Sequence, residues 1–143
     1  MTVAAILARK GRDVLTASPG DTLAEAIAVL AKRKIGALVV TDPANRIIGI
    51  ISERDIVRAV AASAGAVLTE TVASIMTRAV MTCTEGETID SVMSRMTRGR
   101  FRHLPVVAEG KVAGIVSIGD VVKARIEQVE REAEEMRAYI ATA

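Results

Sequence analysis

The sequence predicts a mixed α/β (α+β) protein in which two tandem β-α-β-β-α repeats pack pseudo-symmetrically and a long C-terminal helix follows. Three observations support this fold class. A seven-residue motif occurs twice, as GIISERD at residues 49–55 and as GIVSIGD at residues 114–120. The segments flanking the two copies also correspond, at nearly the offset of the motifs themselves, which is 65 residues (114 − 49). After Gly119 the chain contains no Gly or Pro, which favours one uninterrupted helix.

Each repeat is expected to begin with a short strand and an amphipathic helix. The strands are expected at residues 14–16 and 80–82. The helices are expected at residues 23–30 and 89–96, where apolar residues recur at positions i, i+3, i+4 and i+7. Thr22 to Glu25 fits a capping box, which marks the start of the first of these helices.

Two further strands and a second helix complete each repeat. These elements follow the same order in both copies, with β-branched runs at 35–40 and 102–107, turns at 41–46 and 108–111, and strands at 47–51 and 112–116. Helices are expected to begin near Asp55 and Asp120. A lone unit of about 60 residues has a marginal core, so the tandem arrangement would let the two copies bury each other's apolar faces.

These correspondences predict the domain organisation. The first repeat is expected at residues 1–66, the second at residues 67–125, and a C-terminal helix extension at residues 126–143.

Composition narrows the function classes. Half of the residues are hydrophobic, but there is one Phe, one Tyr and no Trp, so the core must consist of Val, Ile, Leu, Ala and Met. The net charge of +2 is small for a nucleic-acid-binding protein, so nucleic acid is the least favoured of the partners considered. One Cys and one His argue against a disulfide framework and a zinc site. No apolar run reaches the ~18–20 residues of a membrane span, and the N-terminus is a poor signal peptide, so we expect a cytoplasmic protein without a membrane partner.

The repeated motif has two interpretations that do not exclude each other. Ser52 with Asp55, and Ser117 with Asp120, fit a capping box before a helix, which requires no ligand. The same geometry also suits a ligand, because amides at a helix start attract phosphate and a carboxylate one turn later accepts two hydroxyls of a ribose diol. In that interpretation the glycine three residues before each serine lets the ligand approach the backbone.

The pattern Gly-hydrophobic-x-Ser/Thr-x-x-Asp, written twice in this tandem, resembles a pair of CBS (cystathionine-β-synthase) domains, known as a Bateman module. The segment RHLPVV at residues 102–107 is also typical of that family, and the resemblance covers about residues 3–125. It implies a regulatory protein that binds adenosyl ligands, namely AMP, ADP or ATP, with S-adenosylmethionine or NAD as alternatives, in two clefts between the repeats. It also implies pairing into dimers, and a regulated target that is a separate protein.

The resemblance assigns residues to each cleft. One cleft would contain Ser117, Asp120, Ile115, Arg102, His103, Leu104 and Pro105, together with Ile35, Gly36, Ala37 and the 11–13 stretch that includes Arg12. The other would contain Ser52, Asp55, Ile50, the same Ile35, Gly36 and Ala37, the 77–79 stretch that includes Arg78, and residues 101–103. The motifs differ at their two central residues, so the clefts are expected to be unequal, and we favour the Asp120 cleft because basic residues cluster beside it.

Two basic stretches remain open to alternatives. In residues 95–103, Arg100 or Arg102 would neutralise phosphates, or the whole run is a solvated helix end and His103 is a packed side chain. In residues 8–13, Lys10 and Arg12 would wrap a phosphate, or they form a simple basic loop. Cys83, in a strand-like segment at 80–84, is expected to be a small buried hydrophobe.

The C-terminal helix carries a heptad-like seam. Its apolar residues are spaced 4, 3, 4, 3 and 4 apart, at Val122, Ile126, Val129, Ala133, Met136 and Ile140. This stripe either folds back on its own repeats or pairs with a second copy, and we favour a homodimer.

The sequence shows no nucleophile–base pair, no metal-binding constellation and no phosphate-binding P-loop, so we do not expect an enzyme. The leading hypothesis is a regulatory module that binds an adenine nucleotide and signals energy or metabolic state to a partner. The alternative is a structural or interaction protein that binds no ligand and acts through dimerisation and its C-terminal helix.

Overall fold

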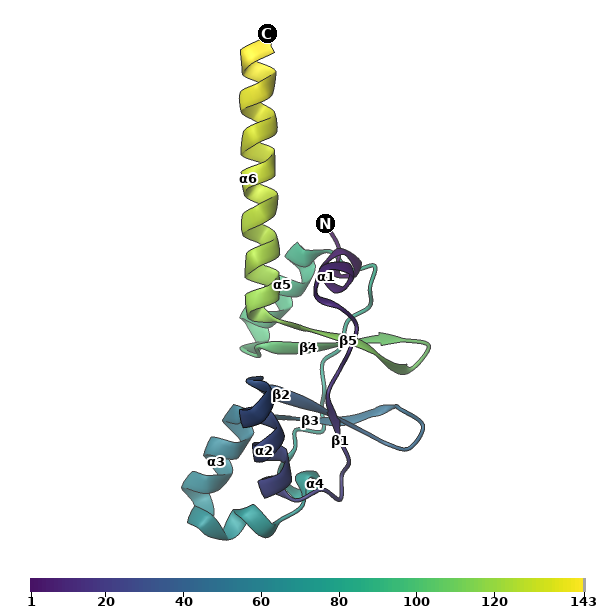
Figure 1. The fold of residues 1–143 in the computed structure, drawn as a ribbon, viewed down its shortest axis with the longest axis vertical. Helices are drawn as coiled ribbons and strands as arrows, with labels where there is room; N and C mark the ends of the chain where they lie inside the picture. Colours follow the sequence, from purple (N-terminus) through teal and green to yellow (C-terminus); the bar gives the residue numbers. More distant parts are fainter. Residues whose placement is uncertain (143) are drawn as a thin grey trace. The chain divides into compact units, whose positions relative to one another are not determined.

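The computed structural model describes residues 1–142 and divides the chain into two compact units. The Asp55 unit comprises Asp13–Thr82 and Val107–Ala113, and the Asp120 unit comprises Met1–Arg12, Cys83–Val106 and the chain from Gly114 onward. Each unit has helices and strands of its own, which confirms the mixed α+β class (Figure 1). The repeat boundaries at residues 66 and 125 stay predictions.

The Asp55 unit is built on a three-stranded sheet in the order β1-β2-β3. β1 (Thr16–Ala17) pairs parallel with β2 (Ala37–Thr41), which pairs antiparallel with β3 (Ile47–Ser52). The helical segments of this unit are α2 (Leu23–Arg33), α3 (Glu53–Ser63), the 3-10 segment η1 (Ala64–Thr69) and α4 (Val72–Ile75). α2 and α3 lie on one side of the β2–β3 pair (Figure 1).

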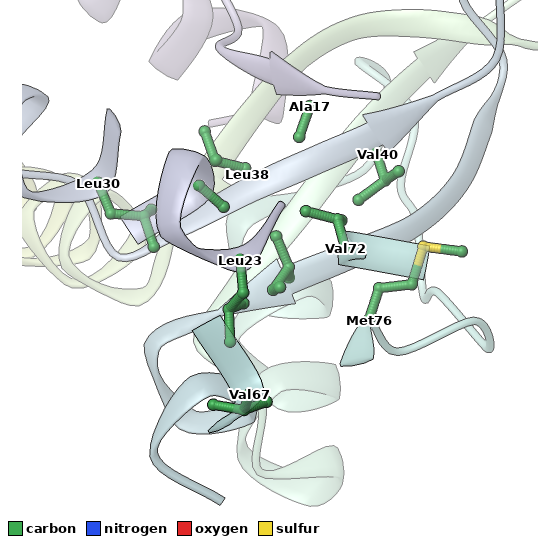
Figure 2. Packing of buried hydrophobic residues seen from close by; sticks show 10 residues of the cluster. Ala17, Leu23, Leu30, Leu38, Val40, Val67, Val72 and Met76 are labelled. Atoms are coloured by element: carbon green, nitrogen blue, oxygen red, sulfur yellow. The ribbon is translucent and has the colours of Figure 1, made fainter. Parts of the chain in front are cut away.

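The core of the Asp55 unit is aliphatic, as the composition predicts. Figure 2 shows residues from α2, β2, η1 and α4 converging between the sheet and the helices. Leu23 and Leu30 come from the predicted apolar stripe of α2, and Leu38 and Val40 point into the same core from β2. No polar or charged side chain among the described residues is buried, so burial of apolar surface stabilises this fold.

The Asp120 unit joins the two ends of the chain. It contains α1 (Val3–Lys10), α5 (Ile89–Gly99) and α6 (Ile118–Thr142), and most of the hairpin formed by β4 (His103–Ala108) and β5 (Lys111–Ser117). α1 is anchored through its backbone, since Val3 and Ala4 donate hydrogen bonds to the carbonyls of Glu87 and Glu85 at 2.9 and 3.0 Å. α6 continues well beyond α1 and α5 (Figure 1).

Most predicted elements are present, and the turns follow their predicted chemistry. Glu109 and Gly110 at the β4–β5 turn both have positive φ, 52° and 77°, as a type I′ hairpin turn requires. At the β2–β3 turn, the Asp42 carbonyl accepts a hydrogen bond from Asn45, whose φ is 63°.

Two expectations need correction, and two helical segments were not expected. The strand expected at residues 80–82 is absent, and only Cys83 forms a single bridge, with Val106. The basic stretch beginning at residue 8 is not a loop, because α1 extends to Lys10 and ends at Gly11, whose φ of 98° stops a helix. η1 and α4 were not expected, and they supply Val67 and Val72 to the core.

Candidate functional site

Each copy of the motif joins a strand directly to a helix and forms the expected capping interactions. Ser52 Oγ accepts a hydrogen bond from the Asp55 amide at 3.4 Å, and Asp55 Oδ2 accepts one from the Ser52 amide at 2.9 Å. At the start of α6, Ser117 Oγ accepts from the Asp120 amide at 3.1 Å, and Asp120 Oδ2 accepts from the Ser117 amide at 2.9 Å. The capping-box interpretation is therefore confirmed in both repeats.

Other amides of these helix starts are also bonded within the protein. The Glu53 amide donates to the Gly36 carbonyl at 3.0 Å, and the Ile118 amide donates to the Arg102 carbonyl at 2.8 Å. Two amides in each first turn thus have acceptors without any ligand. The helix starts are less suited to holding a phosphate than the sequence alone suggests.

The glycine that begins each motif has a packing role. A Cβ added at Gly49 would lie 2.4 Å from Met76 Sδ, and one added at Gly114 would lie 2.8 Å from Leu7 Cδ2. The protein's own side chains therefore fill the space that we had expected a ligand to use.

The Asp55 carboxylate is engaged at both oxygens. Besides the capping bonds, Ser52 Oγ lies 3.0 Å from Asp55 Oδ2, and Thr77 Oγ1 donates to Asp55 Oδ1 at 2.9 Å. Thr77 also exchanges two backbone hydrogen bonds of 2.9 Å with Ile50. The backbone at Thr77 is thus bonded to the strand residue Ile50, and its side chain is bonded to the Asp55 carboxylate.

The Asp120 carboxylate is held differently. Lys10 Nζ donates to Asp120 Oδ2 at 2.7 Å and to the Ile115 carbonyl at 3.0 Å, and neither contact uses Asp120 Oδ1. Ile115 corresponds to Ile50 at the motif offset of 65 residues (115 − 50). A flexible lysine side chain therefore contacts the position that Thr77 contacts through its backbone in the other repeat.

Asp120 is ionised at neutral pH. Burial alone would raise the pKa of this carboxyl, but the hydrogen bond and charge of Lys10, with the Ser117 amide, outweigh it and hold the pKa below its ordinary value. The Lys10 side chain is 34% exposed and the Asp120 side chain 26%, so water reaches this ion pair. The Asp120 carboxylate is thus a charged hydrogen-bond acceptor, and its Oδ1 takes no part in the contacts with Lys10 and the Ser117 amide.

The basic residues near α1 are paired within the Asp120 unit. Arg9 forms an ion pair with Glu127, and Arg12, which we expected to contact phosphate, forms one with Glu85. The Arg9 contact lowers the pKa of the half-buried Glu127 carboxyl. A ligand phosphate would have to compete with these carboxylates.

The other residues that the resemblance assigns to the clefts are distributed between the two units. In the Asp120 unit, Leu104 and Pro105 are buried in β4, whereas Arg102 is exposed and His103 is half-buried. The Asp55 unit contains the half-buried Ile35 and Gly36, the buried Ala37, and the exposed Arg78, which donates to the Ala73 carbonyl at 3.1 Å. Their roles toward a ligand stay predictions.

Within residues 1–142 no group of three or more His, Cys, Asp or Glu side chains could hold a metal ion. Cys83 is buried, and burial, followed by the nearby Glu87 charge, raises the pKa of its thiol to about 11. None of the helices in this part of the chain is long and apolar enough to cross a membrane.

Comparison with known proteins identifies the family. The model of the CBS domain matches the chain twice, at residues 4–62 and 72–127. The chain belongs to the CBS-domain family. The two matches contain the two Ser-x-x-Asp motifs, so each CBS domain has one capped helix start of the kind described above.

Individual CBS-domain relatives agree with this assignment. A CBS-domain protein of Agrobacterium tumefaciens, ATU1752, has a crystal structure with 50% identity and a TM-score of 0.85, covering 87% of this chain and 99% of that one. The mitochondrial protein CBSX3 of Arabidopsis thaliana is 32% identical over 97% of this chain and 71% of its own length. The CBS domain pair of protein MJ0100, crystallised with 5′-methylthioadenosine and S-adenosyl-L-methionine, has 30% identity and a TM-score of 0.80, covering 90% of this chain and 98% of that one.

Proposed function

We propose that this CBS-domain protein is a regulatory module that binds an adenosyl compound at the Asp120 motif and signals energy or metabolic state to a separate partner protein. The observation that carries the proposal is the contrast between the two carboxylates. Asp55 is bonded at both oxygens by its own unit, whereas the Lys10 contact and the cap bond of Asp120 are both made at Oδ2, and that lysine is partly exposed.

The chemistry of this site suits a ribose diol. An ionised carboxylate accepts two hydroxyl hydrogen bonds, and bonds to charged acceptors are stronger than neutral ones. Asp120 is such an acceptor at neutral pH, and Ser117 lies beside it at the helix start. Lys10 has three N–H donors and a flexible stem, so on displacement it can turn toward a phosphate or carboxylate of the ligand.

The ligand class is supported by a relative. The MJ0100 domain pair binds 5′-methylthioadenosine and S-adenosyl-L-methionine, and the two share the adenosyl group. Because most first-turn amides at Asp120 are already bonded, we assign the adenosyl group rather than a phosphate as the part recognised there. AMP, ADP and ATP carry the same group, as do S-adenosylmethionine and NAD.

Regulation follows if the ligand changes the Lys10 contact. A ligand shifts a conformational equilibrium only through different affinities for two states. Lys10 is the last residue of α1 and links that helix to Asp120 and Ile115. A ribose diol that binds Asp120 in place of Lys10 would release the C-terminal end of α1. The surface around this end of α1 would then differ between the free and the ligand-bound protein, and a partner protein could distinguish the two.

Isothermal titration calorimetry tests the proposal with adenosine, AMP, ADP, ATP, NAD, S-adenosylmethionine and 2′,3′-dideoxyadenosine. We expect adenosyl compounds to bind, and we expect the dideoxy compound to bind at least about tenfold more weakly than adenosine, since it lacks the hydroxyls that Asp120 would accept. Comparison of adenosine with its phosphates shows whether phosphate contributes.

Two variants locate the site. Asp120→Ala is expected to abolish binding, whereas Asp55→Ala is expected to retain it. The two changes are matched, because each removes one capping interaction at an equivalent helix start. Equal affinity for adenosine and its dideoxy analogue, or loss of binding in Asp55→Ala alone, would contradict the proposal. If no adenosyl compound binds, the protein is better explained as an interaction protein that acts through its C-terminal helix.

A further inference from the structure

The long helix α6 has two separate apolar faces. The first faces its own unit, where Val121 and Ala124 are buried and Arg125 and Gln128 are half-buried. This face packs beside α5 and α1, and Arg125 forms an ion pair with Asp90 of α5 at 3.4 Å. It fixes the first part of α6 to the Asp120 unit.

The second face is the heptad-like seam, and its own unit does not cover it. The large side chains of the seam are 42% to 66% exposed, namely Val122, Ile126, Val129, Met136 and Ile140. At about 100° per residue, this stripe lies roughly a third of a turn around the helix from Val121 and Ala124. The alternative in which the seam folds back on its own unit therefore does not describe this structure.

We propose that the seam is the interface between two copies of this chain, which join α6 to α6 as a parallel two-stranded coiled coil. The heptad places Ile126, Ala133 and Ile140 at a positions and Val122, Val129 and Met136 at d positions. The proposal is independent of ligand binding at Asp120.

The charges beside the seam select a second copy in the parallel orientation. In a parallel pair, each g residue faces the e residue five positions later on the other helix. Arg125, which pairs with Asp90 through Nη1 and keeps its other N–H donors, then faces Glu130 of the second copy. Glu132 faces Arg137 of the second copy. Both contacts join opposite charges, and the two-fold symmetry makes each of them twice.

An antiparallel pair is disfavoured by the same residues. It would bring e positions together, with Lys123 opposite Arg137 and Glu130 opposite Glu130 of the other helix. Both contacts would join like charges. Glu132 already accepts a hydrogen bond from Gln128 at 3.3 Å through Oε1, which leaves its Oε2 for a cross-helix arginine.

The seam is short but the helix is preformed. Residues 122–140 span about 28 Å, which is little for a coiled coil of isolated peptides. Here the base of α6 is already packed on α5 and α1, so association does not have to nucleate the helix. We therefore expect a dimer that dissociates in the micromolar range.

Sedimentation equilibrium of the full chain tests the interface. We expect a mass of twice 15.1 kDa above micromolar concentration, and the monomer mass on dilution. Ile126→Glu would place two carboxylates in the seam and is expected to give a monomer. Ala138→Glu is the matched control, because it adds the same charge to an exposed position on the opposite side of α6 and should leave the dimer intact.

The cross-helix charges are tested by reversal. Glu132→Arg should weaken the dimer at least several-fold, because it faces Arg137 of the second copy. Adding Arg137→Glu to the same chain should restore the dimer, since each contact again joins opposite charges. A double variant no tighter than the single one would overturn this pairing.

Disulfide trapping tests the orientation. In a Cys83→Ala background, Met136→Cys should cross-link to itself, because equivalent d residues meet in a parallel pair. An antiparallel pair would instead cross-link Met136→Cys chains to Ile126→Cys chains in a mixture. That mixed product, a monomeric wild type at all concentrations, or a dimer that survives Ile126→Glu would each overturn the proposal.

Discussion

Removing the Lys10 ammonium gives the sharpest test of the Asp120 site. Lys10→Met keeps most of the aliphatic side chain and deletes the donor that contacts both Asp120 Oδ2 and the Ile115 carbonyl. The variant should be less stable than wild type, because burial then acts on the Asp120 carboxylate without its cation. The pKa of Asp120 should rise for the same reason.

The magnitude follows from the geometry and exposure of the pair. A hydrogen bond to a charged group contributes about 1.5–3 kcal/mol, whereas an exposed ion pair contributes about 0.2–1 kcal/mol. The contact is short, at 2.7 Å, but the Lys10 side chain is 34% exposed, so solvent screening reduces its strength. We expect the free energy of unfolding to fall by about 1 kcal/mol, which lowers the melting temperature by about 3–4 °C for a chain of this size.

The pH dependence has a defined sign. The pKa of Asp120 is lower in the folded protein than its ordinary value, so the pair stabilises the fold above the unfolded pKa of about 4. This contribution is lost as the pH falls through the folded pKa. The stability difference between wild type and Lys10→Met should therefore be full at neutral pH and should shrink below about pH 4.

Urea unfolding of a double-mutant cycle measures the pair. The cycle combines Lys10→Met with Asp120→Asn, and Lys111→Met serves as a control at an exposed lysine. A coupling free energy near zero at neutral pH would refute the reasoning, as would a stability difference that stays constant down to pH 3.

Three further predictions concern local packing. Gly49→Ala should destabilise the protein by about 1–3 kcal/mol because the new methyl group meets Met76, whereas Gly86→Ala, with open space around it, should be neutral or slightly stabilising in urea unfolding. Gly11→Ala should cost about 1–3 kcal/mol and weaken the end of α1, since a φ of 98° is strained for any residue with a Cβ, and thermal melting measures this. Cys83 should react with a thiol reagent at pH 8 only as fast as the protein opens, because its thiol is buried with a pKa near 11, and rapid labelling in native buffer would contradict this.

The elements that the sequence predicted well are those defined by neighbouring residues. The apolar stripes of α2 and α5, the capping residues Ser52 and Ser117, and the Glu109–Gly110 turn all depend on contacts within one turn of the chain. α1 was missed because its eight residues show only a short stripe, and its backbone partners are the distant Glu85 and Glu87. The prediction of a strand at 80–82 was wrong for a related reason, since strand pairing depends on a partner strand that the local sequence does not specify.

In the candidate site too, local features were predictable from the sequence and long-range contacts were not. The two carboxylates and their serines are readable from the motif, because the capping bonds join residues three positions apart. The difference between Asp55 and Asp120 is not readable, because it depends on Thr77 and Lys10. Lys10 is 110 residues away from Asp120, and a sequence pattern alone does not show that this lysine, rather than Arg12, reaches the carboxylate.

The anchoring of α1 has a consequence for the order in which the protein matures during its synthesis. Asp13–Thr82 forms most of the Asp55 unit and can fold soon after it leaves the ribosome. α1 is made before these elements, but Asp120, which Lys10 contacts, emerges 110 residues after Lys10, which at about 5–20 residues per second is a delay of roughly 6–22 seconds. α1 is therefore among the last of the described helices to reach its native place, and until then its apolar face is a target for chaperones.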